Sequence, residues 1–191
     1  IREIVKSLRT FSRLDEADMK EVDIHEGIES TLLILQHRLK PKQDRPAIAV
    51  IRDYGNLPLV ECYPGQLNQV LMNIVVNAID ALEETKANCT YQDKKDNPDQ
   101  ITITTSVIDS QWVQIAIADN GVGIPKDIQQ RIFNPFFTTK PIGKGTGMGM
   151  SISYQIITEK HGGKLECFST PGEGTEFAIQ IPIKQKVHRT I

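Results

Sequence analysis

Several residue types are scarce in this chain of 191 residues, and each scarcity excludes a class of protein. Three cysteines, an odd number without C-x-x-C spacing, predict neither a disulfide framework nor a zinc site, and favour a reducing, cytoplasmic compartment. A formal net charge of −2 argues against a broad basic face for nucleic acid. No apolar run reaches the roughly 18 residues of a membrane span, so we expect no membrane contact by this chain.

Apolar periodicity predicts an α/β (α+β) two-layer sandwich, with one mixed, mostly antiparallel sheet covered on one face by helices. Residues 1–13 carry a helical stripe, and residues 14–20 are polar and read as a hinge. Asp23 and Glu26 form a capping-box-like pair at the start of a helix that ends near Pro41. Further helices are predicted at 64–84, 127–133 and 151–160, strands at 48–52, 59–62, 101–108, 112–118, 164–169 and 175–181, and irregular segments at 86–100 and 134–149.

The predicted helix at 64–84 is apolar at almost every position, which indicates deep burial. One polar stripe interrupts it at spacings of three and four: Gln66, Gln69, Asn73, Asn77, Asp80 and Glu84. Buried amides without partners cost about 1–3 kcal/mol each, so the stripe faces solvent, is satisfied in the core, or faces a ligand cavity. An amide oxygen also suits a Mg²⁺ ion that is carried by phosphates.

The segment DNGVGIP begins with Asp119, which ends an apolar strand whose alternation points the side chain into the sandwich. A buried, unpaired carboxylate is costly, and an adenine amino group would be a natural hydrogen-bond donor to it. Gly121 and Gly123 allow close approach of the backbone to a base. The alternative is a D-N-G turn that simply joins two strands.

The segment GKGTGMG places glycines at alternate positions before an apolar helix: Gly143, Gly145, Gly147 and Gly149. Successive backbone amides and a helix N-terminus favour phosphate. The pattern is neither a Walker A sequence nor the G-x-G-x-x-G of dinucleotide-binding proteins and protein kinases. A flexible linker is the alternative, and it fits poorly because a packed helix follows at once.

In this order, LMNIVVNAIDAL, DNGVGIP and FFTTKPIGKGTGMGMS resemble the ATP-binding domain of sensor histidine kinases. The wider family includes type II topoisomerase subunits, heat-shock chaperones of the 90 kDa class and mismatch-repair ATPases. The resemblance covers about residues 20–183 and implies the Bergerat-type ATP-binding fold, with ATP and Mg²⁺ as cofactors. It departs from the family in having Met148 and Met150 where leucines are common.

The resemblance also implies roles for single residues. Asn77 matches the Mg²⁺ ligand, Asp119 the adenine-reading aspartate, and Asn73 the first position of the kinase N box; with Lys140, the two asparagines are the catalytic candidates. The other predicted nucleotide contacts are Asp80, Gly121, Gly123, Ile124, Phe133, Phe137, Lys140, Lys144, Gly145, Thr146, Gly147, Met148, Gly149 and Thr175. Each of these roles has an alternative. The phenylalanines could be ordinary core residues, the lysines could be solvated surface residues, and Thr175 could be a purely structural strand residue.

Asn73 distinguishes between branches of the family. Hydrolytic members place a glutamate there as the base for water, and an amide takes up no proton usefully at neutral pH. The resemblance therefore implies a kinase that transfers the γ-phosphoryl group to a histidine. None of His25, His37, His161 and His188 lies in the family's acceptor motif, so that histidine is expected outside this chain.

We expect residues 1–19 to be a remnant of the second dimerisation helix with its linker, 20–183 the catalytic domain and 184–191 a tail. The expected partners are ATP or ADP, the histidine-containing dimerisation domain of the same protein and a response regulator, with the longer protein a homodimer. Three alternatives remain open: an ATP-hydrolysing conformational switch of the same fold, a serine kinase of the anti-sigma type, and a module that binds partners without catalysis.

Overall fold

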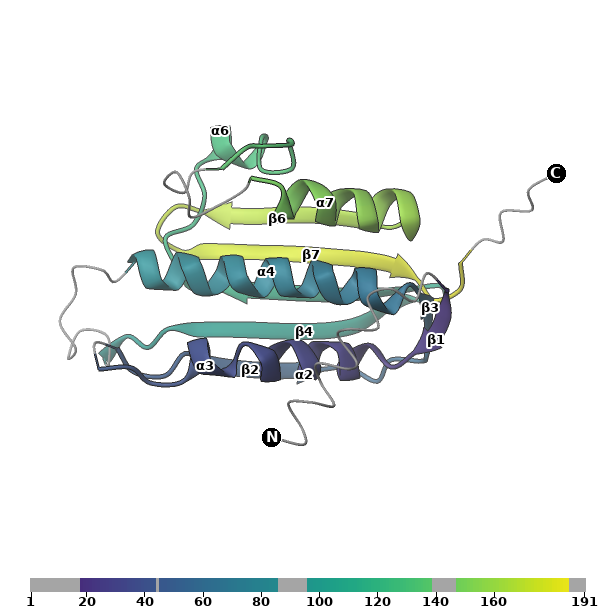
Figure 1. The fold of residues 1–191 in the computed structure, drawn as a ribbon, viewed down its shortest axis with the longest axis horizontal. Helices are drawn as coiled ribbons and strands as arrows, with labels where there is room; N and C mark the ends of the chain where they lie inside the picture. The colour runs from purple at the N-terminus through teal and green to yellow at the C-terminus, as the bar shows by residue number, and fades with distance from the viewer. Residues whose placement is uncertain (1–17, 44, 86–95, 139–146, 186–191) are drawn as a thin grey trace.

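The computed structural model describes residues 18–43, 45–85, 96–138 and 147–185, and it has two layers (Figure 1). The sheet layer contains five strands, β2 (Ala49–Tyr54), β4 (Gln100–Asp109), β5 (Trp112–Asp119), β6 (Lys164–Thr170) and β7 (Gly174–Pro182). They lie in the order β2-β4-β5-β7-β6, with β2 and β4 parallel and the other neighbours antiparallel. The predicted fold class is confirmed.

The helical layer covers one face of this sheet (Figure 1). It contains α2 (Ile24–Ile34), α4 (Pro64–Thr85) and α7 (Gly149–Gln155), the last continued by the π-helical turn η2 (Ile156–Lys160). The Asp23 carboxylate caps α2 by accepting the His25 N–H at 2.9 Å. The core lies between the two layers, where the apolar face of α4 packs on the inward residues of the central strands.

The register of the central strands brings two polar side chains to the same end of the sheet. β5 pairs with β7 so that Asp119 lies opposite Thr175. Inward positions alternate along β5, and Val113, Ile115 and Ile117 are all buried beneath the helices. Because this alternation has a period of two, Asp119 points to the same side as these three apolar residues.

The shorter elements depart from the predictions. The helix expected to run from Asp23 to Pro41 is interrupted at Leu35, and α3 (Gln36–Leu39) follows. The predicted hinge ends in β1 (Lys20–Val22), which pairs with β3 (Val60–Cys62) in a separate antiparallel ribbon. The strand predicted at 59–62 corresponds to β3, but β1 and its pairing with β3 were not predicted, because a strand of three residues has no readable period and its partner lies about forty residues away. The helix α6 (Lys126–Gln129) is shorter than the 127–133 predicted.

His161 joins the end of η2 to the start of α4. Its Nδ1 lies 2.9 Å from the Ile156 carbonyl oxygen, and its Nε2 accepts the Tyr63 N–H at 3.0 Å. Since a carbonyl oxygen only accepts, the proton is on Nδ1 and the ring is neutral. Burial lowers the pKa of His161, which agrees with this neutral, fully buried ring.

Across the described ranges, no helix is both long and apolar enough to cross a membrane. Five predicted features lie wholly or partly outside those ranges: the helix at 1–13, part of the hinge at 14–20, most of the loop at 86–100, half of the irregular segment at 134–149, and the last residues of the tail.

Candidate functional site

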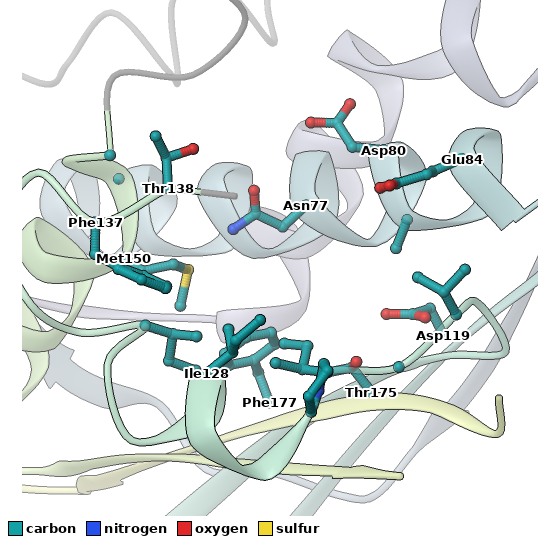
Figure 2. Close-up of a pocket in the computed structure, with 18 residues that line it drawn as sticks. Asn77, Asp80, Glu84, Asp119, Ile128, Phe137, Thr138, Met150, Thr175 and Phe177 are labelled. Carbon is teal, nitrogen blue, oxygen red and sulfur yellow. The ribbon is translucent and has the colours of Figure 1, made fainter. Parts of the chain in front are cut away.

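A cavity of about 470 Å³ lies between α4 and the end of the sheet where β5 and β7 meet. Figure 2 shows Asn77, Asp80 and Glu84 along α4 on one side, and Asp119, Thr175 and Phe177 on the other. The remaining lining is mostly apolar and comes from α4 itself, residues 122–125, α6 and the segment after it, and the start of α7: Ala81, Val122, Gly123, Ile124, Pro125, Ile128, Ile132, Phe137, Thr138, Gly147, Gly149 and Met150. An apolar cavity with a few convergent polar groups is typical of small-molecule sites.

Asp119 is the buried acid of this cavity, with 9% of its surface exposed. Its Oδ1 accepts the Gly121 N–H at 2.9 Å. Burial raises the pKa of Asp119 to about 6, against the opposing effect of the backbone N–H groups of Gly121 and Thr175. The carboxylate is therefore mostly ionised at neutral pH, becomes protonated as the pH falls through about 6, and in its ionised form is suited to accept a further hydrogen bond from a ligand.

Asp80 on the opposite wall is oriented by a cation from α3. The Arg38 guanidinium donates to Asp80 Oδ1 at 2.7 Å and to Glu83 Oε2 at 2.5 Å. These two carboxylates raise the pKa of Arg38 against the effect of burial, so its charge is permanent. Asn77 lies one turn before Asp80 on the same face of α4, which places an amide and a carboxylate side by side at the cavity.

Two glycines next to Asp119 are required by backbone packing. At Gly174, with φ of +109°, an added Cβ would lie 1.9 Å from the Asp119 carbonyl oxygen. At Gly123, with φ of +70°, it would lie 2.2 Å from the Thr170 carbonyl oxygen. Both distances are far below van der Waals contact, so these glycines let β7 and the 122–125 segment close around the carboxylate.

Asn73 lies outside the lining of the cavity. Its Nδ2 donates to the Gly149 carbonyl oxygen and to Ser153 Oγ, both at 3.0 Å. The Ser153 hydroxyl donates to the same Gly149 oxygen at 2.8 Å. The amide thus ties α4 to the first turn of α7.

The family of histidine kinase-, DNA gyrase B-, and HSP90-like ATPases matches residues 62–185, more than half of the chain. The chain belongs to this family. The matched segment contains the asparagine helix, both glycine segments and Thr175, and the predicted membership of this ATPase family is confirmed.

Sensor kinases are prominent among the relatives of this ATPase domain. Sensor kinase CckA of Brucella abortus is 34% identical over 194 residues, covering 94% of this chain and 18% of the relative. The catalytic domain of histidine kinase ThkA is 29% identical with a TM-score of 0.69, covering 87% of this chain and 96% of that one. ThkA in complex with response regulator protein TrrA matches at 26% identity and a TM-score of 0.66, covering 96% of this chain and 47% of that one. The chain thus spans about a fifth of the length of CckA.

The ATPase fold brings together nine of the residues predicted to contact nucleotide. These line the cavity: Asn77, Asp80, Asp119, Gly123, Ile124, Phe137, Gly147, Gly149 and Thr175. Gly121 lies behind Asp119, where its N–H orients the carboxylate. Phe133 lies outside the lining and packs on Tyr154 with ring centroids 5.0 Å apart, and Met148 is 39% exposed outside it. Lys140, Lys144, Gly145 and Thr146 lie outside the described residues.

Sequence reasoning missed most of the apolar lining of the ATPase cavity. Val122 and Pro125 lie within the predicted DNGVGIP segment, and Phe177 follows Thr175 by two residues on the same side of β7, so strand alternation could have indicated it. Ile128 of α6 and Ile132 in the turn after it carry no signal of their own, because an isolated apolar residue looks the same in sequence whether it faces a core or a ligand.

Gly174→Ala should destabilise the ATPase domain far more than Gly172→Ala. Both positions have positive φ, but a Cβ at Gly172 meets nothing within 4 Å whereas one at Gly174 collides with the Asp119 backbone. We expect a loss of about 1–2 kcal/mol in the free energy of unfolding for the Gly172 variant, and a clearly larger loss for the Gly174 variant. Urea denaturation monitored by circular dichroism measures both, and equal losses would contradict the steric explanation.

Proposed function

We propose that this chain is the catalytic ATP-binding domain of a sensor histidine kinase, and that it passes the γ-phosphoryl group of ATP to a histidine outside the chain. The observation that carries the proposal is the buried Asp119 carboxylate facing Asn77 and Asp80 across one cavity. Such an arrangement offers an acceptor for the amino group of adenine at one wall and oxygen ligands for a phosphate-bound cation at the other.

The adenine moiety would lie against the apolar lining with its amino group toward Asp119. The ionised carboxylate accepts a hydrogen bond there, and Phe177 and Met150 exclude water from the base. The phosphates would then lie toward Asn77 and the start of α7, where Gly147 and Gly149 keep side chains away from the backbone. Lys140 and Lys144 are proposed to neutralise the phosphate charge.

Mg²⁺ fits the donor set of the α4 wall. Asn77 supplies an amide oxygen and Asp80 a carboxylate, and Mg²⁺ takes few protein ligands when phosphates supply the rest. The described residues contain no group of three or more His, Cys, Asp or Glu side chains that could hold a metal ion without a nucleotide. When bound, the ion would offset the negative charge that develops on the transferred group.

The position of Asn73 favours phosphoryl transfer to a protein over transfer to water. Its amide has no usable basicity, and its two hydrogen bonds bind it to α7. An amide at position 73 cannot serve as the base that hydrolytic members place there, so water lacks that activation and the group remains available for an imidazole. Catalysis would then rest on positioning and electrostatic stabilisation.

The remaining assignments concern the longer protein. We propose residues 1–19 as the end of a dimerisation helix with its linker, 20–183 as the catalytic domain and 184–191 as a tail. The partners would be the histidine-bearing dimerisation domain of the same protein and a response regulator, within a cytoplasmic homodimer. In support of such a partner, the related ThkA has been crystallised with response regulator protein TrrA.

Asp119→Ala should abolish nucleotide binding, because it removes the charged acceptor at that wall, and a neutral hydroxyl such as that of Thr175 does not replace a carboxylate. In the unmodified chain, ADP affinity should fall as the pH is lowered through about 6, since the raised pKa of Asp119 means that the acceptor becomes protonated there. The Asp119→Asn variant has an amide that does not titrate. Its ADP affinity should therefore not fall at about pH 6 through this group, and should change with pH only through the titration of ADP itself. Isothermal titration calorimetry from about pH 8 to 5 tests both, and unchanged affinity in the alanine variant would refute the assignment.

Asn77→Ala should remove the Mg²⁺ dependence of ADP binding. The unmodified chain is expected to bind ADP one-to-one and roughly tenfold or more tightly with Mg²⁺ than without it, because the ion bridges the amide and the phosphates. Calorimetric titrations with and without Mg²⁺ give the comparison. Mg²⁺ dependence in the variant equal to that of the parent would contradict the metal role.

The destination of the phosphoryl group separates the candidate functions. With γ-labelled ATP and the separately produced dimerisation domain of the longer protein, we expect an acid-labile label on that domain and little phosphate released by this chain alone. Rapid release by the chain alone would favour the hydrolytic switch, and an acid-stable label on serine would favour the serine kinase. Nucleotide binding without any labelling would leave only a binding module.

A further inference from the structure

Ser169 of β6 makes three hydrogen bonds directly behind the Asp119 wall. Its Oγ accepts the Ile124 N–H at 2.7 Å, lies 2.8 Å from the Gly174 carbonyl oxygen, and lies 2.9 Å from Thr175 Oγ1. This serine lies outside the polar stripe and both glycine-rich segments of the sequence, and it comes just before the PGEG turn. Its hydroxyl nevertheless contacts three segments that close around the cavity.

The partners of Ser169 determine where the hydroxyl protons lie. A carbonyl oxygen only accepts, so the single Ser169 proton must point to Gly174; otherwise two oxygens would repel each other at 2.8 Å. In the contact between the two hydroxyls, Thr175 Oγ1 is therefore the donor and Ser169 Oγ the acceptor. With its one proton used in this way, the Thr175 hydroxyl presents only lone pairs to a ligand.

The cavity wall therefore carries two neighbouring acceptors, Asp119 and Thr175, which lie opposite each other in the β5–β7 pair and both line the cavity (Figure 2). A 6-aminopurine offers an amino group with two hydrogens to such a wall. A carboxylate alone does not exclude a 6-oxopurine, because the ring N1–H beside the oxo group can donate to it. A second acceptor does exclude it, because the oxo oxygen would face lone pairs.

We propose that Ser169 is a specificity-determining positioning residue, which fixes the Thr175 hydroxyl as an acceptor and so makes the cavity select 6-amino over 6-oxo purine nucleotides. This inference rests on the proposed nucleotide site. Ser169 lies behind Thr175 and acts through it, without contacting the base.

Gln129 provides a matched control for this role. Its Nε2 donates to the Ile124 carbonyl oxygen at 2.6 Å and to the Ser169 carbonyl oxygen at 2.8 Å. Gln129 therefore holds the same two segments together as the Ser169 side chain does, but it leaves the hydroxyl network unchanged. Gln129→Ala should weaken the binding of all purine nucleotides alike.

The experiment compares the affinities for ADP and inosine diphosphate, which carries an oxo group at position 6 and no amino group at position 2. Calorimetry at about pH 8 keeps Asp119 ionised, since its pKa is about 6. We expect the parent chain to prefer ADP, and Ser169→Ala to reduce the ADP preference about tenfold, because the freed Thr175 proton can donate to the oxo group. Ser169→Thr, which retains the hydroxyl, should restore the preference, and Gln129→Ala should leave the ratio unchanged.

The outcomes separate this inference from the proposed function. If the parent chain binds neither nucleotide, the proposed function fails and the inference with it. If the parent prefers ADP and Ser169→Ala retains the full preference, only the role of Ser169 is overturned. If Ser169→Ala does not fold, Thr175→Val removes the second acceptor at nearly constant volume, and an unchanged ratio in that variant would also overturn the inference.

Discussion

The burial of one carboxylate at the end of β5 is the constraint on which the rest of the site depends. The pKa of Asp119 rises from 3.8 to about 6, which corresponds to a penalty on the order of 3 kcal/mol for its charge in the ligand-free protein. This is a net value, because backbone N–H groups from two segments already act against the effect of burial. Gly174 lets β7 approach the strand that carries the acid. Because burial destabilises the charged form of this carboxylate, a ligand that donates a hydrogen bond to it would stabilise that form.

The helix α4 carries the other half of the site and also connects the helical layer. Its apolar face packs on the sheet, while the side chains of its polar stripe face two different parts of the structure. Asn77 and Asp80 face the cavity, with Asp80 held by Arg38, whereas Asn73 binds the first turn of α7. A single helix thus connects the cavity wall that carries Asn77 and Asp80 to the first turn of α7, which begins at Gly149.

Most of the large elements could be predicted from sequence because their signals are local. The α4 helix, the β4–β5 pair and the β6–β7 hairpin follow from apolar periods of 3.6 and two, and the structure places them within a few residues of the predicted bounds. Some of the short features could not. The strand β3 was predicted, but β1 and its pairing with β3 were not, because a strand of three residues has no readable period. The break at Leu35 leaves the apolar period of α2 intact, so it has no local signature either.

The sequence by itself determined the family, the polar stripe of α4 and the acid that ends β5, because residue type and spacing are properties of the chain alone. Only the tertiary structure decided which residues of the stripe reach the cavity, since a helix face wide enough for six polar side chains meets two different neighbours. It also decided that Ser169 lies behind Thr175. Strand register sets that contact, and register depends on pairing between segments that no local pattern specifies.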